Sequence, residues 1–292
     1  MRLRGMAKIN LGLDVVRKKE DGYHEVRMIM QTIRMYDQID LEISKEPGIH
    51  VQTNLPFLPC DESNLTYKAA KLLMDEFKIQ QGVSIDLKKF IPVAAGMAGG
   101  STDAAAVLVG VNRLFHLGLT RQELMQRGVR IGADVPYCIM RGTALAEGIG
   151  EVLTPLPPMP ACHLLIGKPA VNVSTKFVYT NLRANEITDH PDIDGMIKAI
   201  KENDLHGIVS RMENVLERVT IPEYPVIEEI KKHMKKHGAL GALMSGSGPT
   251  VFGVFDDLDR AKRAASELRK SHLARQVFLT VPFQNGGTMD DR

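Results

Sequence analysis

The chain has 292 residues, of which 44% are hydrophobic and 25% are charged, and its formal net charge is +2 at pH 7. These values are ordinary for one large or two average globular domains, and the small charge argues against nucleic-acid or membrane binding. The three cysteines lie too far apart for a disulfide framework or a cysteine-rich metal site. Because the start lacks the apolar core of a signal peptide, we expect a cytoplasmic protein.

Alternating apolar and polar residues predict strands in the N-terminal part of the chain, over residues 8–16, 28–33, 38–43 and 83–89. Asn64 can cap a helix that begins at the next residue. Thr120 and Glu123 have the spacing of a capping box, which predicts a second helix that runs toward Ile131.

The most informative segment runs from Pro92 to Ala106 and reads P-V-A-A-G-M-A-G-G-S-T-D-A-A-A. It is neither a Walker A loop, since it has no lysine in the required place, nor a Rossmann fingerprint. A strand pattern precedes it, and a helical pattern that ends near Gly118 follows it, with three residues that could cap that helix: Ser101, Thr102 and Asp103. Glycines before a helix start favour a phosphate site, whereas the simpler interpretation is a helix-capping turn.

The proline-rich stretch 155–160 cannot extend a helix or a central strand, so it is the best candidate for an interdomain linker. We therefore predict two domains, residues 1–157 and 158–292. The second begins with a strand over 162–167 and a helical region over 194–219, and its end is expected to be frayed over 284–292. The remaining elements predicted there are helices over 225–236 and 257–270 and strands over 242–244, 251–255 and 276–281.

Four places could carry chemistry, and each also has a purely structural interpretation. Lys8 shares a strand face with Asn10, and it is either a reacting group or a solvent-facing edge residue. Asp134 in G-A-D-V-P is either a general base or a residue that bonds the local backbone. The segment D-G-Y-H-E, residues 21–25, could bind a planar base through an aromatic ring and a histidine, or form only a hairpin. The segment S-G-S-G-P-T, residues 245–250, is a second phosphate-type loop or a hairpin connection.

Taken together, these segments resemble the motifs of the GHMP small-molecule kinases, in the right order and over nearly the whole chain. The segment D-G-Y-H-E discriminates best, because the general kinase loop does not require it. The resemblance implies an enzyme with ATP as phosphoryl donor, accompanied by Mg²⁺. It also implies an α+β fold with a ribosomal-S5-like N-terminal domain and a ferredoxin-like C-terminal domain.

The match is closer to the members whose acceptor is a cytidine-diphosphate-linked methylerythritol. It implies phosphorylation of the C2 hydroxyl of that acceptor, in the non-mevalonate isoprenoid pathway. On this resemblance Lys8 and Asp134 are catalytic, and no metal ligand is assigned. The residues implied to bind ATP are Asn64, Pro92, Val93, Ala94, Ala95, Gly96, Met97, Ala98, Gly99, Gly100, Ser101 and Thr102. The residues implied to bind the acceptor are Asn10, Tyr23, His24, Thr175 and Tyr179.

Two departures from the family pattern matter most. Ala98 stands where the family usually has glycine, so we expect the phosphate loop to differ in geometry there. Gly12 replaces a larger side chain, and we expect looser packing near Asn10.

Other functions stay open on the sequence alone. A related GHMP kinase could act on a mevalonate-like or sugar substrate, although such substrates offer no base for Tyr23, His24 and Tyr179. A ligand sensor on the same fold is a second alternative, and an RNA-binding module is a third because the S5-like fold also occurs in ribosomal proteins. The near-neutral charge argues against RNA. We expect a monomer or weak homodimer that binds no nucleic acid and no membrane.

Overall fold

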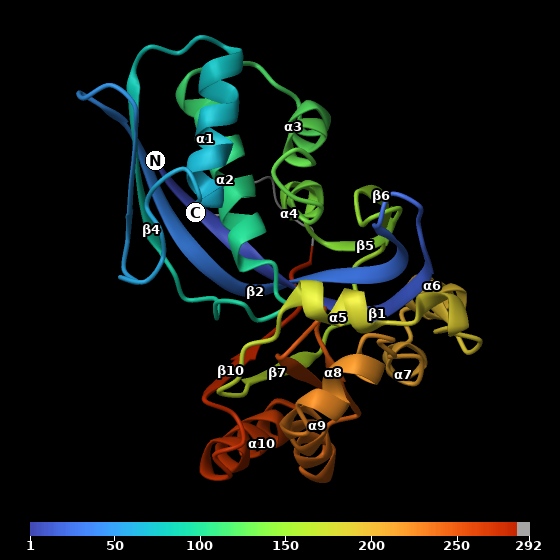
Figure 1. Ribbon diagram of the computed structural model, residues 1–292. Helices are drawn as coiled ribbons and strands as arrows, with labels where there is room; N and C mark the ends of the chain where they lie inside the picture. The colour runs from blue at the N-terminus through green and yellow to red at the C-terminus, as the bar shows by residue number, and fades with distance from the viewer. Residues whose placement is uncertain (285–292) are drawn as a thin grey trace. The chain divides into compact units, whose positions relative to one another are not determined.

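The structure is a computed structural model that describes residues 1–284, so the tail predicted to fray lies outside the described residues except for Gln284. The chain forms two compact units (Figure 1). The first unit comprises Met1–Ala7, Met35–Val93 and Ala98–Met140. The second comprises Lys8–Arg34, Ala94–Met97 and the chain from Arg141 onward. The predicted boundary between residues 157 and 158 remains a prediction.

Two long strands contribute residues to both units. They are β1 (Arg2–Lys18) and β2 (His24–Ser44), which pair with each other. The separate strand patterns at 28–33 and 38–43 are thus parts of one strand. The structural alternative for residues 21–25 is observed, because they lie in a hairpin turn between β1 and β2: Gly22 adopts φ 86°, and Lys19 exchanges backbone hydrogen bonds with Gly22 and Tyr23.

In the first unit, β4 (Gly82–Lys88) lies between β3 (Ile49–Thr53), which is parallel to it, and the antiparallel end of β2. Helices α1 (Leu65–Glu76) and α2 (Gly99–Leu114) pack side by side, as Figure 1 shows. The middle of α2, from Thr102 to Val111, is buried at every position, as expected for a helix enclosed by its neighbours. Helices α3 (Arg121–Gly128) and α4 (Val135–Met140) follow, and the capping box of α3 forms as predicted.

In the second unit, β5 (Thr143–Glu147) lies between the start of β2 and β6 (Val152–Leu156), antiparallel to both. The linker predicted over 155–160 is wrong in its first two residues, because Pro155 and Leu156 belong to β6. Proline is tolerated there because β6 is an edge strand.

The rest of the second unit is built on a four-stranded antiparallel sheet of order β10-β7-β9-β8. Two helices, α9 and α10, pack on this sheet, and side chains from both surround Gly167 on one of its faces. This strand order agrees with the predicted ferredoxin-like arrangement. The bounds are β7 (His163–Lys168), α9 (Val226–Lys236), β8 (Gly241–Met244), β9 (Val251–Phe255), α10 (Leu258–Lys270) and β10 (Gln276–Thr280).

The helical region predicted over 194–219 is divided into short helices. Asn203 leaves α6 in the left-handed conformation with φ 57°, and Asp204 then caps α7 through its side chain. These two polar residues end one helix and start the next. The bounds in this part are α5 (Thr175–Asn181), η1 (Ala184–Glu186), α6 (Ile193–Lys201), α7 (Leu205–Val209) and α8 (Glu217–Glu223). None of the helices within residues 1–284 is long and apolar enough to span a membrane.

Candidate active site

Lys8 is buried, with 5% of its surface exposed, so it is not a solvent-facing edge residue. Its Nζ donates hydrogen bonds to Asn10 Oδ1 over 2.8 Å and to the carbonyl oxygen of Gly96 over 3.2 Å. Its backbone N–H donates to the carbonyl of Met97. Both oxygens that accept these hydrogen bonds are uncharged. Within residues 1–284 its ammonium donates to no charged oxygen, and a buried cation of this kind favours the approach of an anion.

Asn10 is fully buried and holds Lys8 in place. Its Nδ2 donates to the sulfur of Met28 over 3.2 Å, while its Oδ1 accepts from Lys8. The structure thus brings together the two residues that the sequence placed on one strand face. The contact predicted between Asn10 and the acceptor remains a prediction.

The two glycine-rich segments meet at Gly96. Its carbonyl accepts a second hydrogen bond from Ser245 Oγ over 2.9 Å. Gly96 adopts φ 70°, and a Cβ there would lie 2.1 Å from the carbonyl oxygen of Ser245, so no side chain fits. A Cβ at Gly246 would lie 3.0 Å from the Gly96 oxygen and 3.5 Å from Lys8 Nζ. The segment 245–250 therefore connects β8 to β9 and also packs beside Lys8.

Helix α2 begins at Gly99, and its N-cap residue is Ala98. The expectation that Ser101, Thr102 or Asp103 caps this helix is wrong, because all three lie inside it. Ala98 has φ 55° and ψ 30°, a left-handed conformation, and supplies no side-chain acceptor to the helix. The first N–H groups of a helix have no intrahelical acceptor, so this start is suited to an anion.

Asp134 lies directly before α4 and is half-buried. Its carbonyl oxygen accepts the first helical bond from the Cys138 N–H over 3.0 Å. Within the described part of its own unit, no hydrogen bond reaches its carboxylate. Lys8 and Asp134 belong to different units, and their joint action remains a prediction.

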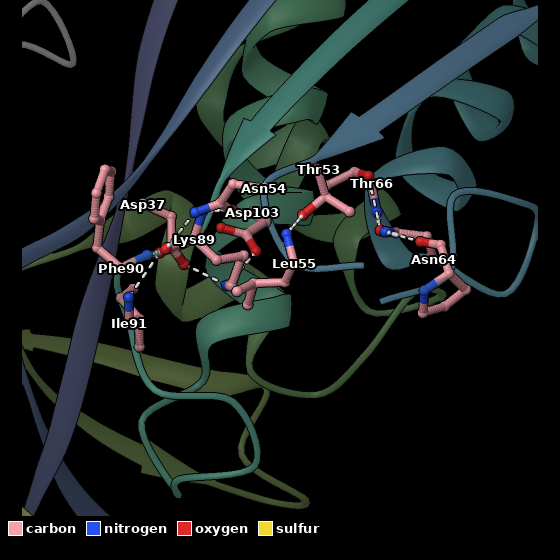
Figure 2. Close-up of polar contacts among 11 residues, drawn as sticks. Asp37, Thr53, Asn54, Leu55, Asn64, Thr66, Lys89, Phe90, Ile91 and Asp103 are labelled. Carbon is pink, nitrogen blue, oxygen red and sulfur yellow. Dashed lines mark hydrogen bonds and ion pairs between the residues drawn. The ribbon is translucent and has the colours of Figure 1, made fainter. Parts of the chain in front are cut away.

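Asn64 caps α1 as predicted. Its Oδ1 accepts from the N–H and the hydroxyl of Thr66, over 2.9 and 2.7 Å (Figure 2). Its Nδ2 donates to the carbonyl of Pro59. Both polar atoms of the Asn64 side chain thus form hydrogen bonds with nearby residues of the chain. Its contact with adenosine remains a prediction.

His24 and Tyr179 form an aromatic pair within the second unit. Their ring centroids lie 5.1 Å apart at an interplanar angle of 46°. Burial, with a smaller contribution from the charge of Lys18, lowers the pKa of His24. Its buried Nε2 has no hydrogen-bond partner within residues 1–284. Neighbouring Tyr23 is 60% exposed. A neutral histidine beside aromatic rings is suited to a planar heterocycle.

Thr175 begins α5 one turn before Tyr179, so both lie on the same helix face. Its hydroxyl forms a hydrogen bond of 2.8 Å with Ser247 Oγ in the second glycine-rich segment. This contact links the aromatic pair to the surroundings of Lys8 within one unit.

Comparisons with known proteins agree with this geometry. Family models described as "GHMP kinases N terminal domain" and "GHMP kinases C terminal" match residues 64–142 and 196–274. A curated relative from Lachnospira eligens, named 4-diphosphocytidyl-2-C-methyl-D-erythritol kinase, is 58% identical over 97% of this chain and 98% of its own length. One of the same name from Clostridium perfringens is 52% identical over 96% and 97%. The chain belongs to the GHMP kinases.

A solved structure of 4-(cytidine 5'-diphospho)-2C-methyl-D-erythritol kinase aligns with a TM-score of 0.83 and 32% identity, covering 98% of this chain and 100% of that one. A mevalonate kinase from L. major aligns with a TM-score of 0.77 but 18% identity, which shows the fold alone. The predicted α+β GHMP kinase fold is therefore confirmed. As a GHMP kinase, the chain is an ATP-dependent small-molecule kinase rather than a ligand sensor or an RNA-binding module.

Sequence reasoning missed two sets of residues in this GHMP kinase. Asn214 is buried, and its Nδ2 donates to the carbonyls of Met244 and Gly246 over 2.9 and 2.8 Å, which shapes the second glycine-rich segment. Lys89 lies buried between Asp37 and Asp103. The sequence shows a lysine shortly before the glycine-rich segment, but it does not show that Asp37 and Asp103, from distant elements, pair with it.

The expectation that Gly12 loosens the packing near Asn10 is wrong. A Cβ at Gly12 would lie 2.9 Å from Ile193 Cδ1 and 3.2 Å from Met196 Cε. Side chains of α6 thus fill the space that a larger residue would occupy.

Proposed function

We propose that this GHMP kinase transfers the γ-phosphoryl group of ATP to the C2 hydroxyl of 4-(cytidine 5'-diphospho)-2-C-methyl-D-erythritol. The product would feed the non-mevalonate route to isoprenoid precursors. Two curated relatives with the corresponding name are 58% and 57% identical to nearly the whole chain. The observation that carries the proposal is the ring pair of His24 and Tyr179, because mevalonate-like and sugar substrates have no base for it to bind.

The proposed chemistry is a direct in-line transfer. Asp134 accepts the proton of the C2 hydroxyl as its oxygen bonds to the γ-phosphorus and the bond to the bridging oxygen of ADP breaks. An aspartate is a weak base in water, so this proton moves late, as the alkoxide forms. Lys8 stabilises the developing negative charge. Its ammonium is fixed by Asn10 and Gly96 before the reaction, so little reorganisation is needed.

The glycine-rich segment from Pro92 to Thr102 is proposed to bind the phosphates of ATP. The start of α2 supplies N–H donors and the positive end of a helix dipole, and Gly96 leaves room for close approach of the backbone. Transfer of this kind depends mainly on positioning and charge stabilisation. Backbone donors can therefore bind the donor phosphates while Lys8 serves the reacting centre.

Magnesium is proposed to enter with the nucleotide. Within residues 1–284 no group of three or more His, Cys, Asp or Glu side chains is arranged to hold a metal. Mg²⁺ commonly keeps several waters and binds through substrate phosphates with only one or two protein oxygens, so it does not require such a group. The ion would neutralise phosphate charge.

The remaining contacts follow from the same proposal. Tyr23 and Tyr179 flank the cytosine, His24 hydrogen-bonds its edge, and Thr175 contacts the acceptor. Asn64 lies near the adenosine. We further propose a cytoplasmic monomer or weak homodimer that binds no nucleic acid.

One assay tests the proposal. The protein is incubated with Mg-ATP and, separately, the cytidylyl acceptor, mevalonate or galactose, and ADP release is followed. We expect ADP only with the cytidylyl acceptor, with phosphorus NMR placing the new phosphate on C2. ADP formed only with mevalonate or galactose would show another GHMP kinase, and ADP with none of them would overturn the proposal.

A further inference from the structure

Lys89 lies between two aspartates in the interior of the first unit. Its Nζ donates to a carboxylate oxygen of Asp37 and, over 2.6 Å, to Oδ2 of Asp103. The three side chains are at most 5% exposed. Figure 2 shows the lysine between the two carboxylates. Asp37 belongs to β2, Lys89 directly follows β4, and Asp103 belongs to α2, so three parts of the first unit meet at the ammonium of Lys89.

The two carboxylates are held very differently. Asp37 accepts three hydrogen bonds, with the backbone N–H groups of Phe90 and Ile91 on Oδ1 and Lys89 on Oδ2. Asp103 accepts only the bond from Lys89, and its buried Oδ1 has no partner within residues 1–284. With both carboxylates ionised, the cluster would carry one negative charge in excess. Such a charge is expensive in a buried site, and the carboxyl with fewer donors takes a proton most easily.

The cluster lies next to both ends of the glycine-rich segment. Asp37 fixes the N–H groups of Phe90 and Ile91, and Asn54 fixes the backbone of Lys89 through bonds of 2.8 and 3.2 Å. On the other side, a Cβ at Gly99 would lie 3.3 Å from both Lys89 Nζ and Ile91 Cγ2. The start of α2 therefore rests directly on Lys89 and Ile91.

We propose that Asp37, Lys89 and Asp103 form a positioning cluster that holds the two ends of the glycine-rich segment together, in which Asp37 is the charged member and Asp103 the protonated one. Neither aspartate is a catalytic residue. The effect on activity rests on the proposed binding of ATP phosphates by that segment. The asymmetry between the aspartates follows from the hydrogen bonds alone. The direction of the pKa shift agrees with this assignment. Burial, reinforced by the charge of Asp37 and opposed by Lys89, raises the pKa of Asp103.

Two isosteric variants test the asymmetry. Asp103→Asn resembles a protonated aspartate, so we expect a melting temperature within about 2 °C of the wild type at about pH 4, where the unfolded carboxyl also keeps its proton. In kinetic assays we expect an unchanged KM for ATP. Asp37→Asn turns an NH₂ group toward the ammonium or toward the two backbone donors. We expect it to lower the melting temperature by at least about 5 °C and to raise the KM for ATP at least about tenfold. The KM for the acceptor should stay within about twofold in both.

If Asp37→Asn does not fold, Asn54→Ala provides a milder test, because it releases the backbone of Lys89 without creating a buried charge. A rise of about threefold in the KM for ATP with an unchanged KM for the acceptor is expected. Equal effects of the two Asn substitutions, or a larger effect of Asp103→Asn, would overturn the protonation asymmetry. An unchanged KM for ATP in both Asp37→Asn and Asn54→Ala would overturn the positioning role.

A separate variant tests the phosphate assignment on which the kinetic effect rests. Ser101→Asp places a negative charge in the first turn of α2, where helices tolerate it well. If the segment binds phosphates, the KM for ATP rises at least about tenfold. If the KM for ATP stays unchanged, the phosphate assignment fails, and the melting temperatures of the two aspartate variants still decide the charge states of the cluster.

Discussion

The hydroxyl of Ser245 donates a hydrogen bond of 2.9 Å to the carbonyl oxygen of Gly96, which joins two glycine-rich segments 149 residues apart. Lys8 donates to the same oxygen. One backbone carbonyl thus fixes both the proposed reacting lysine and the segment proposed to bind phosphates. The contact makes Gly96 a position where a side chain should disrupt both segments.

Gly96→Ala should destabilise the protein strongly. Its Cβ would lie 2.1 Å from the Ser245 carbonyl oxygen, and alanine is strained at φ 70°. Together these effects should lower the free energy of unfolding by roughly 2–5 kcal/mol. Gly118→Ala is the matched control, because Gly118 has φ 73° but no atom within 4 Å of the added Cβ. Urea denaturation checks both variants, and equal losses would show that strain rather than packing decides.

Ala98→Gly should stabilise the protein. Ala98 adopts φ 55°, and a left-handed L-residue costs roughly 1–2 kcal/mol, part of which the greater freedom of glycine in the unfolded chain offsets. We expect a gain of up to about 1 kcal/mol and a melting temperature about 2 °C higher. Ala105→Gly, inside α2, should have the opposite sign. A melting temperature lowered by Ala98→Gly would contradict the strain.

Lys8→Met and Asp134→Asn should each lower kcat by at least about 100-fold. Calorimetry should show that binding of a non-hydrolysable ATP analogue changes by less than about threefold, because neither residue is proposed to bind the nucleotide. Since both residues are proposed to act in the same chemical step, the double variant should lose little more activity than the worse single variant. Near-normal turnover of Asp134→Asn with intact nucleotide binding would contradict the proposed role of Asp134 as the proton acceptor.

Tyr179→Leu should raise the KM for the cytidylyl acceptor about tenfold while the KM for ATP stays within about twofold, because stacking on an aromatic ring contributes roughly 1–3 kcal/mol per base. Tyr179→Phe keeps the ring, so it should raise the KM for the acceptor less than Tyr179→Leu does. Burial lowers the pKa of His24, so its ring stays neutral as the pH falls through the ordinary titration range near 6.5. The acceptor KM should therefore be flat down to about that pH. A KM for ATP that rises equally in Tyr179→Leu would contradict acceptor recognition by this pair.

The stability of the wild type relative to Asp103→Asn should fall as the pH rises. Burial raises the pKa of Asp103, so the folded carboxyl keeps a proton that the unfolded chain has already released. Its stabilisation is complete below the ordinary pKa near 4 and is lost as the pH rises through the raised value. The charged groups that face it are Lys89 and Asp37. Melting curves between about pH 4 and 8 check the trend, and parallel curves for the two proteins would contradict it.

Local structure was predictable where adjacent residues determine it. The cap at Asn64, the capping box at Thr120 and the strands around residues 245–250 all formed as expected, because caps, turns and alternation involve neighbours in the chain. The cap of α2 was not predictable, because three suitable polar residues occur together, and the helix starts earlier, at Gly99, with Ala98 as its N-cap residue.

The sequence by itself determined the family, the nature of the proposed ligands and most of the elements, because motif residues and periodicity are written along the chain. Only the tertiary structure showed that Lys8 is buried on the Gly96 carbonyl, that His24 meets Tyr179, and that Lys89 lies between Asp37 and Asp103. Each of these contacts joins residues from distant elements. Burial and charge pairing depend on how strands and helices pack, and periodicity along one segment carries no information on its partners.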